Sequence, residues 1–202
     1  MGSDHYFSSS PASERNTRTI RAVLAGREVE LTTAGGVFSP DHLDEGTHVL
    51  LDTVSPPPST GNLLDLGTGW GPIAVSLALQ SPDASVWAVD VNERALDLVR
   101  HNATRLGLHN VNAMLPDDVP AGLRFATIWS NPPIRVGKVE LHAMLSRWLP
   151  LLDDGADAWL VVAKHLGAES LQRWLGDDLG LDVERAETSK GFRVLKARRP
   201  SA

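Results

Sequence analysis

The sequence predicts an α/β fold in which a mostly parallel sheet of seven strands follows an N-terminal β-hairpin. From residue 62 onward, short apolar runs typical of buried strands alternate with longer stretches of helical periodicity. This alternation is typical of right-handed βαβ units, which place their strands in a parallel sheet. The last two strand-like runs flank Lys190-Gly191, a turn too short for a helical crossover. We therefore expect the final strand to be antiparallel.

Local signals predict each element in turn. Strand-like runs at 19–24 and 27–32 flank Ala25-Gly26, a break that suits a hairpin, and a helix is expected around 46–54. Pro72 favours the first turn of a helix, and Gly107 favours the position just after one. The expected sheet strands are 62–66, 85–89, 111–115, 125–129, 156–163, 183–187 and 192–197, with helices at 72–79, 92–106, 138–148 and 168–175.

The bulk composition fits one domain. The chain has 202 residues, of which 42% are hydrophobic and 22% charged, enough for one continuous core. We expect a polar N-terminal segment at 1–17 and a single domain at 18–200, divided into a hairpin and helix (18–60) and a catalytic core (61–200). Neither a membrane span nor a secretory signal is recognisable, so cytoplasm is the expected compartment.

Composition also argues against several kinds of chemistry. The chain contains no cysteine, and its 7 histidines lack zinc-type spacing, so neither disulfides nor a metal site is expected. A net charge of −6 argues against non-specific coating of nucleic acid. Residues 188–202 nevertheless hold five basic residues and no acid. That run predicts either a local basic patch or a solvated strand and tail.

The run from Leu64 to Pro72, LDLGTGWGP, predicts a cofactor-binding turn at the carboxyl end of a strand, where open α/β sheets bind ligands. Its glycines let a ligand approach the main chain. Asp65 is placed to reach a ligand ammonium or an ordered water, and Asp90, at the end of the next strand, to accept from both ribose hydroxyls. These features predict S-adenosylmethionine (SAM). The expected cofactor-binding residues are Asp65, Gly67, Thr68, Gly69, Gly71, Asp90, Val91, Asp117, Asp118 and Asn131.

Two details of this segment favour SAM over a nicotinamide dinucleotide. The dinucleotide fingerprint needs glycine or alanine three places after its second glycine, where this chain has Pro72. An acid two residues before the first glycine is also typical of SAM binders.

Asp117 and Asp118 follow the third strand of the sheet, where either is expected to accept from the adenine amino group or to be a solvated turn residue.

The run Asn131-Pro132-Pro133-Ile134 predicts where the methyl acceptor is held. Conjugated exocyclic amines are poor nucleophiles because the nitrogen lone pair is delocalised. Hydrogen bonds to the Asn131 side-chain oxygen and the Pro132 carbonyl would keep the amine pyramidal, and two prolines stiffen that geometry. Catalysis would rest on proximity and electrostatic stabilisation, without a metal. The expected catalytic residues are Asn131, Pro132, Pro133 and Ile134, and Arg135 and Lys138 are expected to bind phosphate or a base edge or to solubilise the surface.

Together these motifs resemble a family, the Rossmann-like class I SAM methyltransferases with a "methyltransferase small" domain, which includes small-subunit ribosomal RNA guanine-N2 methyltransferases. Residues 36–39 and 43–51 resemble its pre-domain signature, 131–138 its catalytic loop, 191–196 its closing strand and 5–8 its start. The resemblance implies transfer of a methyl group from SAM to guanine N2 or adenine N6 of ribosomal RNA. Its implied partner is RNA, either ribosomal RNA or the small ribosomal subunit.

The chain departs from that family in two places. The ribosomal enzymes carry a degenerate duplicate domain before the catalytic one, and this chain has room for the catalytic half alone. Ile134 stands where many members have an aromatic residue that stacks on a flipped base. Two alternatives stay open. One is methylation of a glutamine amide in a protein, whose family usually has tyrosine in place of Ile134, and the other is a domain that binds RNA or a partner without a cofactor.

Overall fold

The computed structural model describes residues 17–201, except the side chain of Arg135, so the segment at 5–8 lies outside the described residues. The hairpin consists of β1 (Thr17–Leu24) and β2 (Arg27–Ala34). The remaining strands are β3 (Asn62–Leu66), β4 (Ser85–Val89), β5 (Val111–Met114), β6 (Phe125–Ser130), β7 (Leu152–Ala163), β8 (Asp182–Ser189) and β9 (Phe192–Arg198). The α-helices are α1 (Glu45–Thr53), α2 (Pro72–Gln80), α3 (Glu93–Arg105), α4 (Lys138–Trp148) and α5 (Ala168–Asp177).

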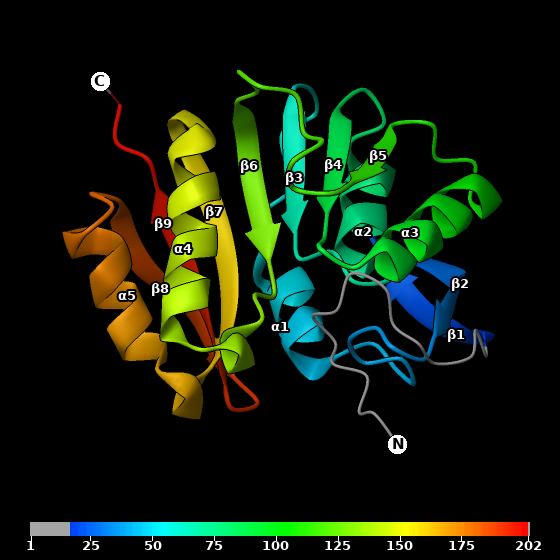
Figure 1. Cartoon of the computed structure of the whole chain (residues 1–202), viewed down its shortest axis with the longest axis horizontal. Coiled ribbons are helices and arrows are strands. Elements are labelled where there is room, and N and C mark those ends of the chain that lie inside the picture. Colours follow the sequence, from blue (N-terminus) through cyan, green and yellow to red (C-terminus); the bar gives the residue numbers. More distant parts are fainter. Residues whose placement is uncertain (1–16, 202) are drawn as a thin grey trace.

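Seven strands form one sheet in the order β5-β4-β3-β6-β7-β9-β8, and the hairpin is a separate sheet (Figure 1). Strands β3 to β7 run parallel, and β9 is antiparallel to both of its neighbours. The predicted fold class is therefore confirmed. The main difference is the start of β7, at Leu152 instead of residue 156, because Leu152 pairs with Phe125 of β6 across an irregular register. The polar run Asp153-Asp154-Gly155 concealed this pairing.

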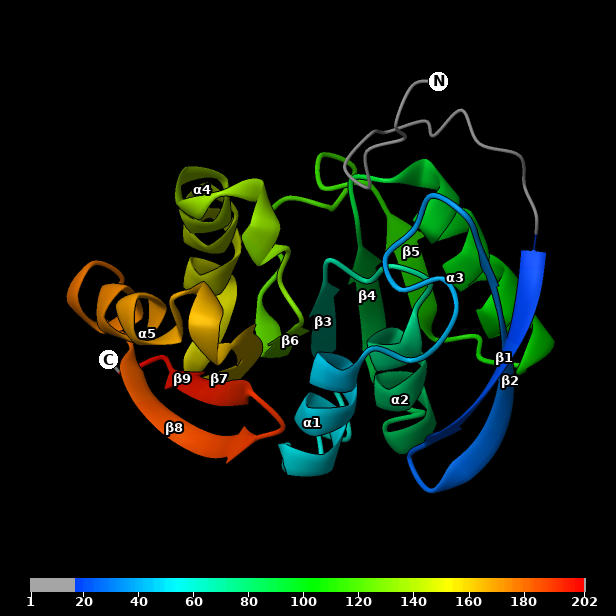
Figure 2. The ribbon, with the colours of Figure 1, turned by 90° about the horizontal axis from the view of Figure 1, so that it is seen from below.

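Strands β3 and β6 lie side by side, and the chain reverses its direction of travel across the sheet between them. Right-handed crossovers therefore place α2 and α4 on opposite faces. One apolar cluster contains residues of α1 and α2, and another contains residues of α4 and α5. Figure 2 shows these two pairs of helices on opposite sides of the sheet. The carboxyl ends of β3 and β6 meet at this reversal, which is where open α/β sheets bind ligands.

Residues of β3 alternate between the two faces with the two-residue period of a strand. Leu63 packs in the cluster that contains α1 and α2, whereas Leu64 and Leu66 pack in the cluster that contains α4 and α5. All three side chains are buried, as expected for a strand that is covered on both faces. The Ser130 hydroxyl at the end of β6 donates to the Leu66 carbonyl at 2.6 Å and so ties the two strand ends together.

A buried asparagine connects the hairpin to the glycine turn. Asn102 on α3 accepts from Thr32 N at 2.7 Å and donates to Thr32 O at 2.9 Å and Trp70 O at 3.0 Å. These bonds satisfy groups that would be costly to bury alone. The Trp70 indole in turn donates to the carbonyls of Phe38 and Ser39, each at 3.1 Å. The segment after the hairpin is thereby held against the turn and becomes part of the site.

Candidate active site

The glycine turn is shaped by main-chain hydrogen bonds to the end of β4. The amides of Gly67 and Thr68 donate to Val89 O at 2.8 and 3.1 Å. Gly67 has φ +76°, and a Cβ placed there would lie 3.9 Å from Pro133 Cδ, so the turn opens directly onto the Asn-Pro-Pro loop. At Gly71, φ is +96° and a Cβ would lie 3.0 Å from Val99 Cγ2. The first glycine therefore leaves room for a ligand, and the last allows α2 to approach α3.

Asp65 supports this turn from behind. Its Oδ2 accepts from the Thr68 hydroxyl at 2.6 Å and from Ala74 N, in the first turn of α2, at 2.9 Å. Its Oδ1 is buried and has no partner within the described residues. Burial raises the pKa of Asp65 to about 7, although the two hydrogen bonds oppose the rise. Asp65 lines none of the cavities around the turn. The described contacts of Asp65 thus support the turn, and the contact with a ligand ammonium or an ordered water that we expected stays a prediction.

Asp90 lies at the end of β4, as predicted, on the wall of a 200 Å³ cavity that is otherwise mainly apolar. Its carboxylate accepts from Gly69 N and Asn92 N, each at 2.9 Å. Burial raises the pKa of the Asp90 carboxyl, and these backbone donors offset part of the rise. Each carboxylate oxygen retains a lone pair for a further donor such as a ribose hydroxyl. Val91 lines the same cavity and offers an apolar surface to an adenine ring.

We expect Asp90→Ala to raise the dissociation constant of SAM by about 10- to 100-fold, since a hydrogen bond to a charged group contributes about 1.5–3 kcal/mol. Isothermal titration calorimetry with SAM measures this directly. Asp83→Ala, at an exposed position just before β4, is the matched control and should leave the affinity unchanged. An Asp90→Ala protein that bound SAM as tightly as the parent would contradict the assigned contact.

The Asn131 side chain is held in one orientation at the end of β6. Its Nδ2 donates to Asp44 Oδ2 at 2.8 Å and to Thr47 Oγ1 at 3.0 Å. Asp44 also accepts from Thr47 N at 3.1 Å, as the N-cap of α1. Since both contacts described for Asn131 use its nitrogen, the oxygen Oδ1 is left to accept a hydrogen bond from a substrate. The amine-binding function predicted for Asn131 would use this oxygen, and it stays a prediction.

The rest of the loop bends back on itself. Pro132 O accepts from Ile134 N at 2.8 Å and keeps a second lone pair for a substrate amine. Pro133 lines the cavity that contains Asp90, and Asn131 lines a small cavity next to Gly67, Thr68 and Gly69. The ends of β3 and β6 therefore lie next to each other. The glycine turn and the loop enclose one continuous region between them.

A larger, mainly apolar cavity of about 370 Å³ adjoins this region, and we call it the acceptor cavity. Asn131, Pro132, Pro133 and Ile134 form one side of it. Its other walls come from segments far away in the sequence, namely Phe38, Asp44, Ala163, His165, Leu166 and Phe192. The acceptor cavity shares Phe38, Asp44 and Asn131 with the small cavity beside the glycines. The two cavities therefore lie next to each other on either side of these three residues.

Some predicted residues lie elsewhere. The Asp90 cavity is lined by Pro116 but by neither Asp117 nor Asp118. The Asp117 side chain is 89% exposed and pairs with Arg147 at 2.8 Å. Lys138 donates to Ser170 Oγ at 3.3 Å in a neighbouring cavity of 140 Å³, which Ile134 also lines.

The basic run near the C-terminus does not form a free cationic patch. Its side chains are paired with acids on neighbouring elements, and Arg193 is buried. The pairs are Lys190 with Glu45, Arg193 with Glu169, Lys196 with Glu184, Arg198 with Asp157 and Arg199 with Asp154. Of the two interpretations of this run, the structure supports neither an open basic patch nor a fully solvated strand. The charges serve mainly to join β9 to its surroundings.

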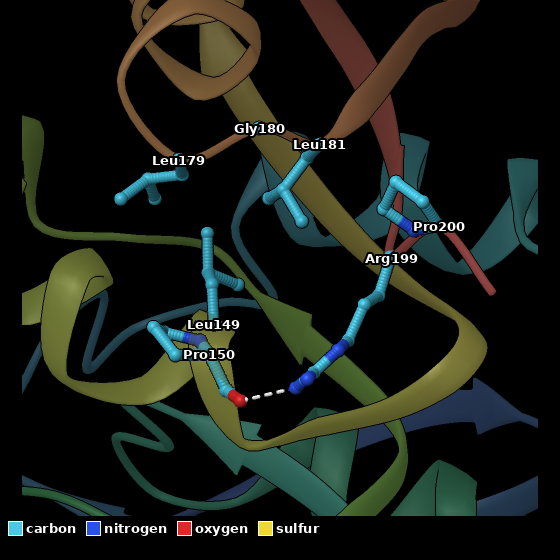
Figure 3. Close-up of a pocket in the computed structure, with 7 residues that line it drawn as sticks. All are labelled: Leu149, Pro150, Leu179, Gly180, Leu181, Arg199 and Pro200. Carbon is cyan, nitrogen blue, oxygen red and sulfur yellow. Dashed lines mark hydrogen bonds between the residues drawn. The ribbon is translucent and has the colours of Figure 1, made fainter. Parts of the chain in front are cut away.

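Another hollow, of about 280 Å³, lies at the opposite edge of the sheet, where β7 begins and β9 ends (Figure 3). Arg199 extends across it and donates to Pro150 O at 2.6 Å and Leu152 O at 2.9 Å. The one charged side chain of this hollow is thus bonded to the backbone of the fold, and the other lining residues are proline, glycine and leucine. None of the predicted site residues lies there.

The residues around the glycine turn fit SAM. Gly67 leaves an open approach, Asp90 presents a carboxylate, and Leu66, Val91 and Trp148 add apolar walls. Among residues 17–201, no cluster of histidine, aspartate or glutamate is arranged to hold a metal ion. In the same part of the chain, no helix is long and apolar enough to cross a bilayer.

The sequence analysis missed the residues that surround Asn131. Phe38, Asp44 and Thr47 lie in the segments that resembled the pre-domain signature, and Phe192 lies in the one that resembled the closing strand, but no function was assigned to any of them. His165 gave no signal at all. Their positions in the cavity depend on packing between α1, β9 and the loop after β6, which spacing along the chain does not reveal.

Solved structures share the fold of this chain. A 16S rRNA N2 methyltransferase from Thermus thermophilus, solved with AdoMet and guanosine, has a TM-score of 0.80 and 22% identity, covering 94% of this chain and 52% of that one. A methyltransferase from Pyrococcus furiosus has a TM-score of 0.62 and 21% identity, covering 76% of this chain and 81% of that one. These similarities show the fold.

Two sequence relatives differ in how much of the chain they match. An uncharacterised protein of Bacillus subtilis, YbxB, is 35% identical over 98% of this chain and 99% of its own length. Ribosomal RNA small subunit methyltransferase C of Yersinia enterocolitica is 39% identical over 54% of this chain but only 31% of its own length. The family model described as methyltransferase small domain matches residues 28–196. The chain therefore belongs to the methyltransferase small domain family and is a SAM-dependent methyltransferase.

Proposed function

We propose that the protein methylates an exocyclic amino group of a base in ribosomal RNA, with guanine N2 as the first candidate and adenine N6 as the second. One observation carries the proposal. The fixed Asn131 amide presents its oxygen where the SAM region joins the acceptor cavity, and that cavity has Phe38 and Phe192 in its walls. A mainly apolar cavity with a few polar groups suits a planar base that carries an amine.

The aromatic walls also bear on the departure noted at Ile134. Ile134 offers an apolar contact without a π face, but Phe38 and Phe192 line the same acceptor cavity. These rings can supply the stacking surface that a flipped base needs. The loss of an aromatic residue after Asn-Pro-Pro therefore does not argue against a nucleic-acid base.

In the proposed mechanism, Asn131 Oδ1 and Pro132 O accept the two N–H groups of the amine. SAM supplies an electrophilic methyl carbon. Held in this way, the amine would direct its lone pair at that carbon. Bound SAM would give up the methyl group with the S–C electron pair staying on sulfur, and the methylated nitrogen would release one proton to water. Asn131 contributes by positioning the nitrogen and by stabilising its developing positive charge. No general base of raised basicity is required.

Relatives suggest two acceptors. The proteins named ribosomal RNA small subunit methyltransferase C point to RNA. A release factor glutamine methyltransferase of Vibrio cholerae is 45% identical over 76 residues, although these cover only 27% of its length. A glutamine side-chain amide, which is also a conjugated NH₂ group, is thus the alternative to a nucleic-acid base.

Labelled SAM tests the proposal. The protein is incubated with methyl-tritiated SAM and, separately, with small ribosomal subunits, naked ribosomal RNA, DNA and a protein extract. We expect label in ribosomal RNA, and nuclease digestion should yield N2-methylguanosine. Excess S-adenosylhomocysteine should suppress the label. Label in methylglutamine of the protein extract, with none in RNA, would replace the base by the glutamine amide.

A further inference from the structure

Asp44 occupies a position that the proposed mechanism does not yet use. It is the N-cap of α1 and lines both the acceptor cavity and the small cavity beside the glycine turn. Its side chain contacts Asn131, from which it is separated by 87 positions in the sequence, at 2.8 Å. We infer that Asp44 selects guanine over adenine at the acceptor site. The inference rests on the proposed function and names the base that the site accepts.

The hydrogen bonds of Asp44 leave one of its oxygens for a substrate. In the region that the structure covers, both of its contacts, Thr47 N at 3.1 Å and Asn131 Nδ2 at 2.8 Å, end on Oδ2. The carboxylate is acceptor-only, so Oδ1 offers further lone pairs on the cavity wall. Asn131 Oδ1 is the neighbouring acceptor. The site therefore presents two hydrogen-bond acceptors side by side.

Two adjacent hydrogen-bond acceptors complement the N1 and N2 edge of guanine but not the N1 and N6 edge of adenine. Guanine presents two adjacent donors, N1–H and the N2 amine. With its amine on Asn131, guanine would direct N1–H at Asp44. Adenine presents its N6 amine beside the N1 lone pair, so the same pose would set a lone pair against a carboxylate. Sites that leave a buried polar group unpaired, or oppose like charges, discriminate strongly.

Gly46 keeps this arrangement compact. A Cβ at Gly46 would lie 2.9 Å from Asp44 Oδ2 and 2.9 Å from Phe192 Cε1. The carboxylate and the Phe192 ring are thus packed on either side of the same glycine. An aromatic surface and an edge-reading carboxylate in one wall are the two elements that recognition of a flipped base needs.

The variant Asp44→Asn tests this inference. Asparagine is an equally good N-cap, and its oxygen can keep accepting from Thr47 and Asn131. Its Nδ2 would then face the base and donate to an N1 lone pair. We therefore expect the preference to reverse. Guanosine binding should fall about 10-fold, while adenosine and 2-aminopurine riboside, which both place an N1 acceptor beside the amine, should bind more tightly.

Binding of the three nucleosides is measured by saturation-transfer NMR on protein loaded with S-adenosylhomocysteine. Methylation of a small-subunit ribosomal RNA transcript is measured in parallel as the ratio of N2-methylguanosine to N6-methyladenosine. Glu45→Gln removes a charge from the next residue, which is exposed and pairs with Lys190, and should leave the ratio unchanged. Thr47→Val removes the other group that holds Asn131 and should lower the rate without changing the ratio.

The outcomes distinguish the inference about Asp44 from the proposed methylation of a base. A wild-type protein that makes N2-methylguanosine, with an Asp44→Asn variant that loses activity equally on all bases or keeps its preference, would overturn the inference alone. Asp44 would then only position Asn131. A wild-type protein that binds none of the nucleosides and methylates no RNA would remove the proposed function and the inference together. Circular dichroism melting confirms that each variant is folded.

Discussion

Replacing Asn131 by alanine is expected to lower kcat by about 100- to 1,000-fold, the range found when one preorganised group that stabilises transition-state charge is removed. In the proposed mechanism, Asn131 Oδ1 accepts from the reacting amine, and Asp44 and Thr47 hold the Asn131 side chain through its nitrogen. Alanine leaves the amine free to return to a planar, delocalised geometry. The alanine variant also leaves the Asp44 carboxylate without one of its two donors.

The Asn131→Ala substitution should slow the chemical step and should leave the affinity for SAM nearly unchanged. Asp90 and Val91, which line the cavity expected for the nucleoside, do not contact Asn131, so SAM affinity should change only a few-fold. Calorimetry with SAM and steady-state kinetics on ribosomal RNA give the two numbers. Asn112→Ala, on β5 and away from these cavities, is the matched control. A kcat within threefold of the parent for Asn131→Ala would refute the amine-holding role.

Most of the fold could be predicted because its signals are local. Each βαβ unit carries its own apolar runs, and the glycine turn and Asn131 follow directly after β3 and β6. The reversal of strand order then brings them together, since the carboxyl ends of neighbouring parallel strands share an edge. Local pattern and topology together were enough to find the parts of the site that lie on strand ends.

Residues on other segments could not be predicted in this way. Asp44 reaches Asn131 only because α1 packs beside the sheet, and Phe192 enters the same wall from β9. Asp117 was placed near adenine by its position after β5, but its pairing with Arg147 of α4 depends on tertiary packing. The basic run at the C-terminus does not form an open basic patch, for the same reason. Its partners come from other elements, and a charge count along the chain does not include them.

Asp65 shows a different limit of prediction from sequence. The sequence identified an acid at the correct place in the turn, but it did not reveal which atoms the carboxylate serves. The structure shows that Oδ2 caps α2 through Ala74 N and holds the Thr68 hydroxyl. A negative group at a helix N-terminus is favourable, yet this one is fully buried. The gain from capping and the cost of burying a charge therefore oppose each other at one residue.

This opposition predicts that Asp65→Asn stabilises the protein at neutral and alkaline pH. Burial raises the pKa of Asp65 to about 7 in the folded state, from 3.8 for an unperturbed group. The folded state thus binds the proton more tightly than the unfolded state. The stability that protonated Asp65 contributes is complete below pH 4 and is lost as the pH rises towards 7. At about 1.4 kcal/mol per pKa unit, the loss reaches about 4 kcal/mol above pH 7.

Asparagine is neutral at every pH, and its oxygen can accept from both Thr68 and Ala74. Denaturant unfolding at pH 5 and pH 8 should therefore show a smaller gain for Asp65→Asn at the lower pH and a larger gain at the higher one. A gain of equal size at both pH values would mean that the carboxyl does not titrate in this range. Calorimetry on the same variant also tests the direct contact expected from the sequence. A supporting residue leaves SAM affinity nearly unchanged, whereas loss of binding would show that Oδ1 meets the ligand ammonium.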